Sequence, residues 1–450
     1  MKQKVILIEF NELTHELMEK FISEGHLPNF KRFYEQSQVH TTDANASGED
    51  LNPWVQWVSL HSGLDPDEHG VRRLNDAAGF KGEFVWDKLS KAGLKSWICG
   101  SMNTNFLDGF NGMLIPDPWS AGTAPYPPGK FDVYVDFIQQ SVQGHDSKSS
   151  VSSKDFVRFM LKNGLSLSTI IAIAKQLVSE KRSSGNFWKR ASIMDLIQFD
   201  LFKYHFAKES PDLSSFFLNS VAHYQHHYWA DMDPERFGQS GESARADTKE
   251  AILFGYKSLD RILGKFMQLA DSDTVLVFCT ALSQQPYVTS SPEEERHYFH
   301  IIDDKSFAQS LGITQEHEYI PVMAEQFHLQ CESNAAASKL CDYLNEFDMD
   351  SNDYFHVGSD QVFLATCDDN TVHVQCRCTK QVKSDAKIIH RISKSELAFY
   401  DIFYHMEDVK AGVHNPKGML WVLDPNKKPE VHKEDIALEV VSPMVQNYFS

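Results

Sequence analysis

Residues 223–227 are the segment of the chain whose residue types and spacing most clearly suggest metal binding or proton transfer. His223, His226 and His227 stand three and four residues apart, so a helix here places three imidazoles near one face. Imidazole is the commonest metal ligand among side chains and a frequent proton-transfer group near neutral pH. The tyrosines and tryptophan around them also fit an aromatic-rich packing helix, and the spacing alone leaves both interpretations open.

Two acidic residues bracket Asn11 at the end of the first apolar run, residues 5–10. Open α/β sheets bind ligands at the carboxyl ends of their strands, which makes Glu9 and Asn11 candidate catalytic residues. Of the nearby carboxylates, we choose Glu9 as the candidate that could supply negative charge or act as a general base. Strand alternation turns Glu9 and Asn11 to the same face with Phe10 opposite, so Glu9 can instead lie beneath the site.

The elements that must position these residues alternate between strand and helix patterns. Apolar runs at 5–10, 95–100, 216–218 and 274–279 predict strands, and amphipathic stretches such as 15–23 and 244–269 predict helices. Pro53 is well placed in the first turn of another helix, which carries Trp54, Trp57 and His61 on its packing side. This alternation predicts an α/β fold with a doubly wound, mostly parallel sheet flanked by helices.

Changes in composition divide the chain into core and inserted segments. Residues 121–153 are rich in Pro, Gly and Ser, and helical periodicity dominates the segment from 154 to 208. We therefore expect core segments at 1–120, 211–281 and 401–450, a helical insertion at 121–210, and a small α+β cap at 282–400. A hairpin turning at Asp368-Asp369-Asn370 lies inside that cap.

Five segments, taken together and in order, carry a family resemblance. They are residues 5–11, 59–71, 219–223, 275–282 and 412–418. In this order they resemble the alkaline phosphatase superfamily, most closely its type I phosphodiesterase/nucleotide pyrophosphatase branch. The resemblance implies an alkaline phosphatase-like fold and a hydrolase with two divalent cations roughly 4 Å apart, one of which activates a Thr or Ser nucleophile.

When the family's residues are carried over position by position, the nucleophile-activating half of the site lacks its charged ligands and its nucleophile. The first-strand Asp of the family falls on Asn11, and the later Asp-His pair falls on Ala281 and Leu282. The nucleophile falls on Pro53 or, with a slip of one residue, on Asn52, neither of which can attack phosphorus or sulfur. We therefore expect no metal in this subsite and keep Asn52 as a catalytic-position candidate.

The second cation site retains more of its ligands. The Asp of the family's Asp-x-x-x-His element falls on Asn219, its His is kept as His223, and the last His is kept as His414. Two neutral imidazoles and an amide oxygen can hold one ion with weakened affinity, because no anionic donor remains. The resemblance thus implies at most one Zn²⁺ or Mn²⁺, with a metal-free protein as the alternative.

Neutral amides gather in the predicted cleft. Gln56 and Gln284 join Asn11, Asn52 and Asn219 as groups that both donate and accept hydrogen bonds, and so can bind a polar ligand without charge. We assign Gln56, Gln284, His226 and His227 to substrate binding.

Composition limits the partners and the location. A net charge of −19 without a long basic run argues against nucleic acid or an anionic membrane surface as the main partner. Residues 165–178, the most apolar helical stretch, are interrupted by Ser, Thr and Lys, so no membrane span is predicted. The start lacks a signal-peptide pattern, and seven cysteines form no CxxC pair, which predicts a cytoplasmic protein with a small-molecule substrate and leaves a homo-oligomer open.

Three functions fit these residues. The favoured one is a divergent hydrolase or transferase of phosphate or sulfate esters, with at most one metal and water as the attacking group. The second is a non-catalytic protein that binds a phosphorylated or glycosylated small molecule in the same crevice. The third is a metal-free enzyme in which Glu9, His223 or His414 transfers a proton.

Overall fold

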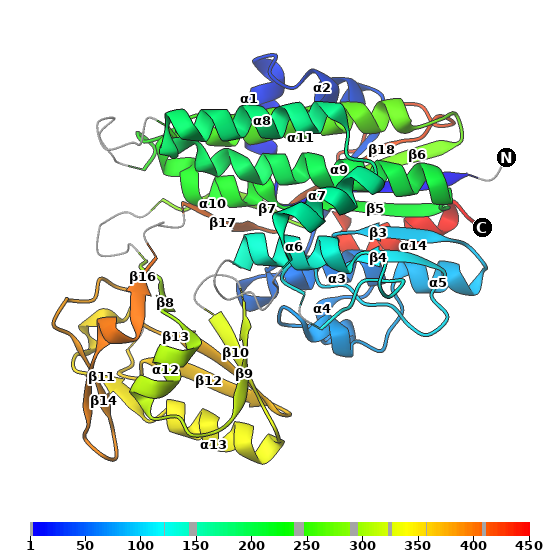
Figure 1. Ribbon diagram of the computed structural model, residues 1–450. Helices are drawn as coiled ribbons and strands as arrows, with labels where there is room; N and C mark the ends of the chain where they lie inside the picture. The colour runs from blue at the N-terminus through cyan, green and yellow to red at the C-terminus, as the bar shows by residue number, and fades with distance from the viewer. Residues whose placement is uncertain are drawn as a thin grey trace. The chain divides into compact units, whose positions relative to one another are not determined.

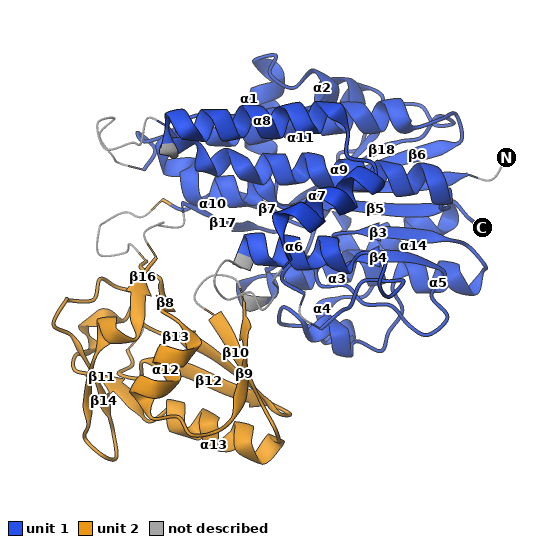
Figure 2. Ribbon diagram, in the orientation of Figure 1, with its two compact units in different colours: residues 1–142, 148–287, 411–450 blue, residues 143–147, 288–410 orange. Residues whose placement is uncertain are grey.

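The chain forms two units. The computed structural model describes residues 3–120, 122–143, 151–237, 247–288, 296–322, 326–356, 358–406 and 411–450. Unit 1 contains residues 1–142, 148–287 and 411–450, and unit 2 contains residues 143–147 and 288–410 (Figure 2).

A mostly parallel sheet forms the centre of unit 1 and confirms the predicted fold class. Its strands lie in the order β19-β2-β18-β6-β1-β5-β3-β4, with β20 also paired to β2. Their bounds are β1 Lys4–Phe10, β2 Gln38–Asp43, β3 Ser96–Cys99, β4 Gly112–Ile115, β5 Leu213–Leu218, β6 Thr274–Cys279, β18 Lys417–Leu423, β19 Glu430–Val431 and β20 Ile436–Ala437. The strand β1 pairs in parallel with both β5 and β6, so the carboxyl ends of these three strands meet at one edge.

Helices cover both faces of this sheet, as Figure 1 shows, with α9 and α11 on one side and α3 and α14 on the other. The helices α6, α7, α8 and α9 come from the segment predicted as a helical insertion, 121–210, most of which belongs to unit 1. The helices of unit 1 are α1 His15–Ser23, α2 Pro28–Glu35, α3 Pro53–Ser62, α4 Pro66–His69, α5 Val85–Lys91, α6 Asp132–Gln143, α7 Ser153–Lys162, α8 Leu167–Arg182, α9 Arg190–Glu209, α10 Ser220–Met232, α11 Ala251–Leu269 and α14 Val441–Asn447.

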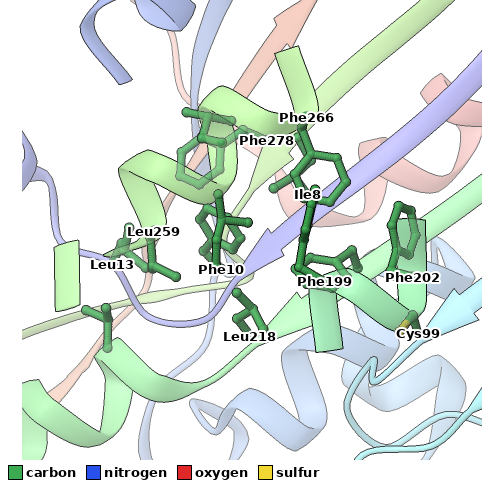
Figure 3. Packing of buried hydrophobic residues seen from close by; sticks show 14 of the residues in the cluster. Ile8, Phe10, Leu13, Cys99, Phe199, Phe202, Leu218, Leu259, Phe266 and Phe278 are labelled. Carbon is green, nitrogen blue, oxygen red and sulfur yellow. The ribbon is translucent and has the colours of Figure 1, made fainter. Parts of the chain in front are cut away.

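The core explains why β1 reads as a continuous apolar run. Parallel strands are buried on both faces, and Ile8 and Phe10 point from β1 towards α9 and α11. Figure 3 shows Phe10 near Phe278 of β6, with ring centroids 5.9 Å apart, and Ile8 beside Phe266 of α11. Since Phe10 faces this apolar side, its neighbours Glu9 and Asn11 face α3.

Unit 2 is an α+β unit. It contains sheets of order β12-β13-β10-β9 and β11-β14-β15 and the pair β16-β8. Its elements are β8 Phe299–Ile301, α12 Asp304–Leu311, β9 His317–Pro321, β10 Gln326–Cys331, α13 Asn334–Leu344, β11 Phe347–Met349, β12 Phe363–Asp368, β13 Thr371–Cys376, β14 Lys387–His390, β15 Glu396–Ala398 and β16 Phe403–His405. The hairpin formed by β12 and β13 turns at the predicted Asp368-Asp369-Asn370.

The boundaries of unit 2 differ from the predicted cap, 282–400. The strands β7 (Ser283–Pro286) and β17 (Gly412–Asn415) pair with each other in unit 1, so the chain leaves unit 1 after residue 287 and returns at residue 411. Short polar strands such as Ser283-Gln284-Gln285 carry little sequence signal, which explains the shifted boundary. Within the described residues, no helix has the length and apolar content needed to cross a membrane.

Candidate metal centre

Three potential ligands converge at the carboxyl edge of the central strands. Glu12 follows β1, His226 projects from α10, and His414 lies on β17. One ligand atom from each residue lies within 4.8 Å of the others. The Oε2 atom of Glu12 is 3.0 Å from His226 Nε2 and 3.6 Å from His414 Nε2. These three residues are called the Glu12 cluster below.

Backbone carbonyls fix which nitrogen each imidazole presents to the cluster. His226 Nδ1 lies 3.0 Å from the carbonyl oxygen of Gly412, and His414 Nδ1 lies 2.8 Å from that of Leu51. A carbonyl only accepts, so both Nδ1 atoms must carry the proton and donate. Each neutral ring then turns the Nε2 lone pair towards Glu12, which is how metal-bound histidines are usually oriented.

The arrangement therefore calls for positive charge between the three residues. A carboxylate oxygen and two imidazole lone pairs repel one another unless a cation or added protons lie among them. Gln284 donates from Nε2 to Glu12 Oε2 and, at 3.1 Å, to the carbonyl oxygen of Ala222, which holds the carboxylate in place. One carboxylate and two imidazoles form a donor set suited to zinc or manganese, so the residues fit the ion that the resemblance implies.

Glu12 adopts a backbone conformation that non-glycine residues rarely use. Its φ is +60°, and its side chain is buried. Gln225, also buried, donates from Nε2 to the carbonyl oxygen of Glu12 at 2.7 Å and accepts from the Tyr256 hydroxyl at 2.8 Å. Such left-handed residues cost free energy and are kept where the surroundings enforce them, often at functional sites.

Electrostatics keep Glu12 ionised, and this gives a first prediction. Without a bound ion, protons on the Nε2 atoms of His414 and His226 take the place of the cation. Burial raises the pKa of Glu12, but the positive charge on these protonated rings, with hydrogen bonds from His226 and Gln284, outweighs burial and lowers the pKa to about 2 from 4.5. A lowered carboxyl pKa stabilises the fold above the unfolded-state value, and this contribution disappears as the pH falls through the folded-state value.

We therefore expect metal-free wild-type protein, prepared with a chelator, to be more stable at pH 6 than the Glu12→Gln variant. The difference in the free energy of unfolding should be on the order of 3 kcal/mol, which is the contribution of the carboxylate. The difference should shrink as the pH falls from 4.5 towards 2. Urea unfolding of both proteins at pH 6, 4 and 3 measures it, and a difference that does not change with pH would contradict the assignment.

Asn11 and Asn219 bond directly to each other. Asn11 Nδ2 donates to Asn219 Oδ1 at 2.8 Å and to Glu12 Oε1 at 2.9 Å, while Trp57 Nε1 donates to Asn11 Oδ1 at 2.8 Å. The predicted ligand Asn219 thus accepts from a neighbouring amide, and Asn11 positions Glu12. Ala281 and Leu282, which follow β6, are fully buried and apolar.

His223 lies apart from the role predicted for it. It is exposed one turn before His226 on α10, and its ring packs against that of His227 with centroids 4.3 Å apart. The helix turns Val221, Ala222 and Gln225 inward, which brings His226 and not His223 towards Glu12. Of the predicted ligands, the Glu12 cluster includes only His414.

Glu9 lies beneath the cluster, in the interior. Its side chain is fully buried, its Oε1 is 2.8 Å from His61 Nε2, and the Ser101 hydroxyl donates to Oε2 at 2.6 Å. The His61 ring stacks on Trp57, with centroids 5.7 Å apart. A carboxylate enclosed in this way links α3 to the sheet and is withdrawn from solvent.

Asn52 follows a residue that contacts the Glu12 cluster, whereas Gln56 makes a hydrogen bond within its own segment of the chain. Asn52 is half-buried at the N-cap of α3 and follows Leu51, whose carbonyl accepts from His414. Gln56 is buried and donates from Nε2 to the carbonyl oxygen of Asp50 at 2.8 Å. Asn52 thus adjoins the residue that holds His414, and the amide nitrogen of Gln56 is engaged by the backbone.

A cavity of about 520 Å³ lies near residues 44–50 and 63–68, outside the Glu12 cluster. Its lining includes Asp50, Asp65, Asp67 and Glu439 and no basic side chain. Asp50 and Asp67 pair with Arg72, but nothing in the lining itself attracts an anionic ester, so we do not assign the substrate to it.

A comparison with protein families agrees with the resemblance. Residues 5–282 match the family described as type I phosphodiesterase/nucleotide pyrophosphatase. No curated protein matches the chain.

Solved structures that match the chain include phosphonoacetate hydrolase from Sinorhizobium meliloti 1021 in complex with phosphonoformate, at 11% identity and a TM-score of 0.45, covering 100% of this chain and 96% of that one. Murine ectonucleotide pyrophosphatase/phosphodiesterase 5 matches at 10% identity and 0.43, covering 99% and 95%. A mutant of alkaline phosphatase PafA matches at 9% and 0.48, covering 100% and 96%. The family match spans more than half of the residues of this chain, which therefore belongs to the type I phosphodiesterase/nucleotide pyrophosphatase family.

Proposed function

We propose that this protein hydrolyses or transfers phosphate or sulfate esters with a single divalent cation held by Glu12, His226 and His414. One observation carries the proposal: two imidazoles, each fixed by a backbone carbonyl, aim their Nε2 atoms at one ionised carboxylate. When bound, the cation would supply Lewis-acid stabilisation of charge on an ester oxygen.

The side chains around the cluster support binding of an anion. The helix α3 begins at Pro53, directly after Asn52, and the partial positive charge of a helix N-terminus favours negative ligands. His414 is linked to this turn through Leu51, so the N-terminus of α3 lies beside the cluster. Asn52, the candidate at the nucleophile position, can hydrogen-bond an ester oxygen through its amide.

Water is the proposed attacking group. The positions that match the family nucleophile carry Pro53 and Asn52, which have no hydroxyl. Asn11, at the position of the family's first-strand Asp, carries no charge and uses its amide to donate to Asn219 and Glu12. Both observations favour one cation over two.

Elemental analysis combined with turnover tests this function. We expect about one zinc or manganese per chain, with hydrolysis of p-nitrophenyl phosphate, bis(p-nitrophenyl) phosphate or p-nitrophenyl sulfate that stops with chelator and returns with metal. Two cations per chain would contradict the proposed site, and turnover unaffected by chelator would favour metal-free chemistry.

The missing nucleophile also favours a second candidate, a non-catalytic binding protein. Thermal stabilisation by a phosphorylated or glycosylated ligand, without turnover of any of the three esters, would select it over the hydrolase.

A further inference from the structure

Helix α8 exposes apolar side chains and buries polar ones, the reverse of an ordinary surface helix. Its outward side carries Leu167, Ile170, Ile171, Leu177 and Val178, and Leu167 is 72% exposed. Its buried residues are polar: Thr169, and Gln176, which donates to the carbonyl oxygen of Asn186 at 2.8 Å. These five apolar residues are called the α8 face (α8 is labelled in Figure 1).

The neighbouring segments extend this apolar character. Val157 and Leu161 of α7 and Phe187 after α8 are also about half exposed. Half of the large hydrophobic side chains that are exposed in the described part of the chain lie between residues 157 and 187. Such concentration is unusual on a water-soluble surface and marks an interaction site.

The same segment reverses the charge of the protein. Residues 154–190 contain eight Lys or Arg and only two Asp or Glu, in a chain of net charge −19. Both acids face arginines: Glu180 accepts from Arg190 at 2.7 Å, and Asp155 lies 3.5 Å from Arg158. Lys175, Lys181 and Arg182 are exposed on α8 itself.

This combination selects the class of partner. A second copy docking by the same α8 face would bring two cationic surfaces together across a two-fold axis, which is unfavourable. An anionic bilayer surface offers negative headgroups for the basic residues and hydrocarbon for the apolar ones. The net negative charge of the whole chain does not cancel this local attraction, because salt screens charges that lie more than about 8–10 Å apart.

We propose that the α8 face docks the protein on an anionic membrane surface, with Leu167, Ile171 and Leu177 inserted at the headgroup boundary and Lys175, Lys181 and Arg182 against lipid phosphates. The helix lies along the membrane and does not cross it. This surface is independent of the Glu12 cluster.

Vesicle flotation tests the proposal with the full chain. Wild-type protein should bind vesicles of phosphatidylcholine with phosphatidylglycerol, bind phosphatidylcholine alone at least about tenfold more weakly, and dissociate at high salt. Two double variants, Leu167→Gln with Leu177→Gln and Lys181→Glu with Arg182→Glu, should each weaken binding at least about tenfold. Ile392→Gln in unit 2 is the matched control, since Ile392 is 69% exposed and should not affect binding.

Circular dichroism and urea unfolding check that the variants remain folded, as their side chains are exposed. Three results would overturn the proposal: no vesicle binding, equal binding to neutral and anionic vesicles, or a concentration-dependent dimer that the Leu167→Gln and Leu177→Gln changes dissociate. The last result would assign the α8 face to a second copy of the chain.

Discussion

Glu12→Gln should weaken zinc or manganese binding by at least about 100-fold, because it removes the only anionic donor from a set of two neutral imidazoles. The amide keeps the shape of the side chain, so the loss reports charge and not packing. Competition with a chromophoric chelator measures the affinity directly, without requiring a substrate.

Two histidine variants on the same helix separate the observed cluster from the one predicted by family position. His226→Ala should lose metal binding to a similar extent, whereas His223→Ala, an exposed position one turn earlier, should retain the wild-type affinity. The reverse pattern would assign the ion to Asn219, His223 and His414 and refute the Glu12 cluster.

His61→Ala should destabilise unit 1 by about 3–5 kcal/mol, because it leaves the carboxylate of Glu9 buried without its partner. Urea unfolding followed by tryptophan fluorescence measures the change. Replacing both residues, as Glu9→Leu with His61→Leu, should recover much of the loss, since no buried charge then remains.

An exposed pair provides the control for this second effect. His26 lies 3.6 Å from Glu24, and both side chains are more than a third exposed, so His26→Ala should change stability by less than about 0.5 kcal/mol. If Glu9→Gln abolished turnover while leaving the unfolding free energy unchanged, Glu9 would be catalytic and the structural assignment would be wrong.

Sequence reasoning predicted the fold because its signals are local. Buried parallel strands such as β1 and β6 are continuous apolar runs, and Pro53 marks the start of α3 at the residue where the helix begins. The family resemblance singled out His414, which lies in the Glu12 cluster and which periodicity alone could not connect to residues four hundred positions earlier.

The remaining ligands depend on packing. Whether His223 or His226 faces the sheet is set by the rotation of α10, and the inward residues Val221, Ala222 and Gln225 already indicated the side that carries His226. Glu12 stands at the position after the family's Asp, and its selection requires the left-handed turn that aims the carboxylate at both rings. No periodic pattern in the sequence encodes that turn.

The pairing of β7 with β17 has a consequence for how relatives can diversify. Tyr287 N–H donates to the carbonyl oxygen of Ala411 at 2.8 Å, so the chain departs and returns through adjacent ends of one two-stranded ribbon. Gln284 and His414 lie opposite each other on that ribbon. An excursion anchored in this way can be lengthened, shortened or exchanged for another domain during evolution while His414, a proposed ion ligand, keeps its register with Gln284.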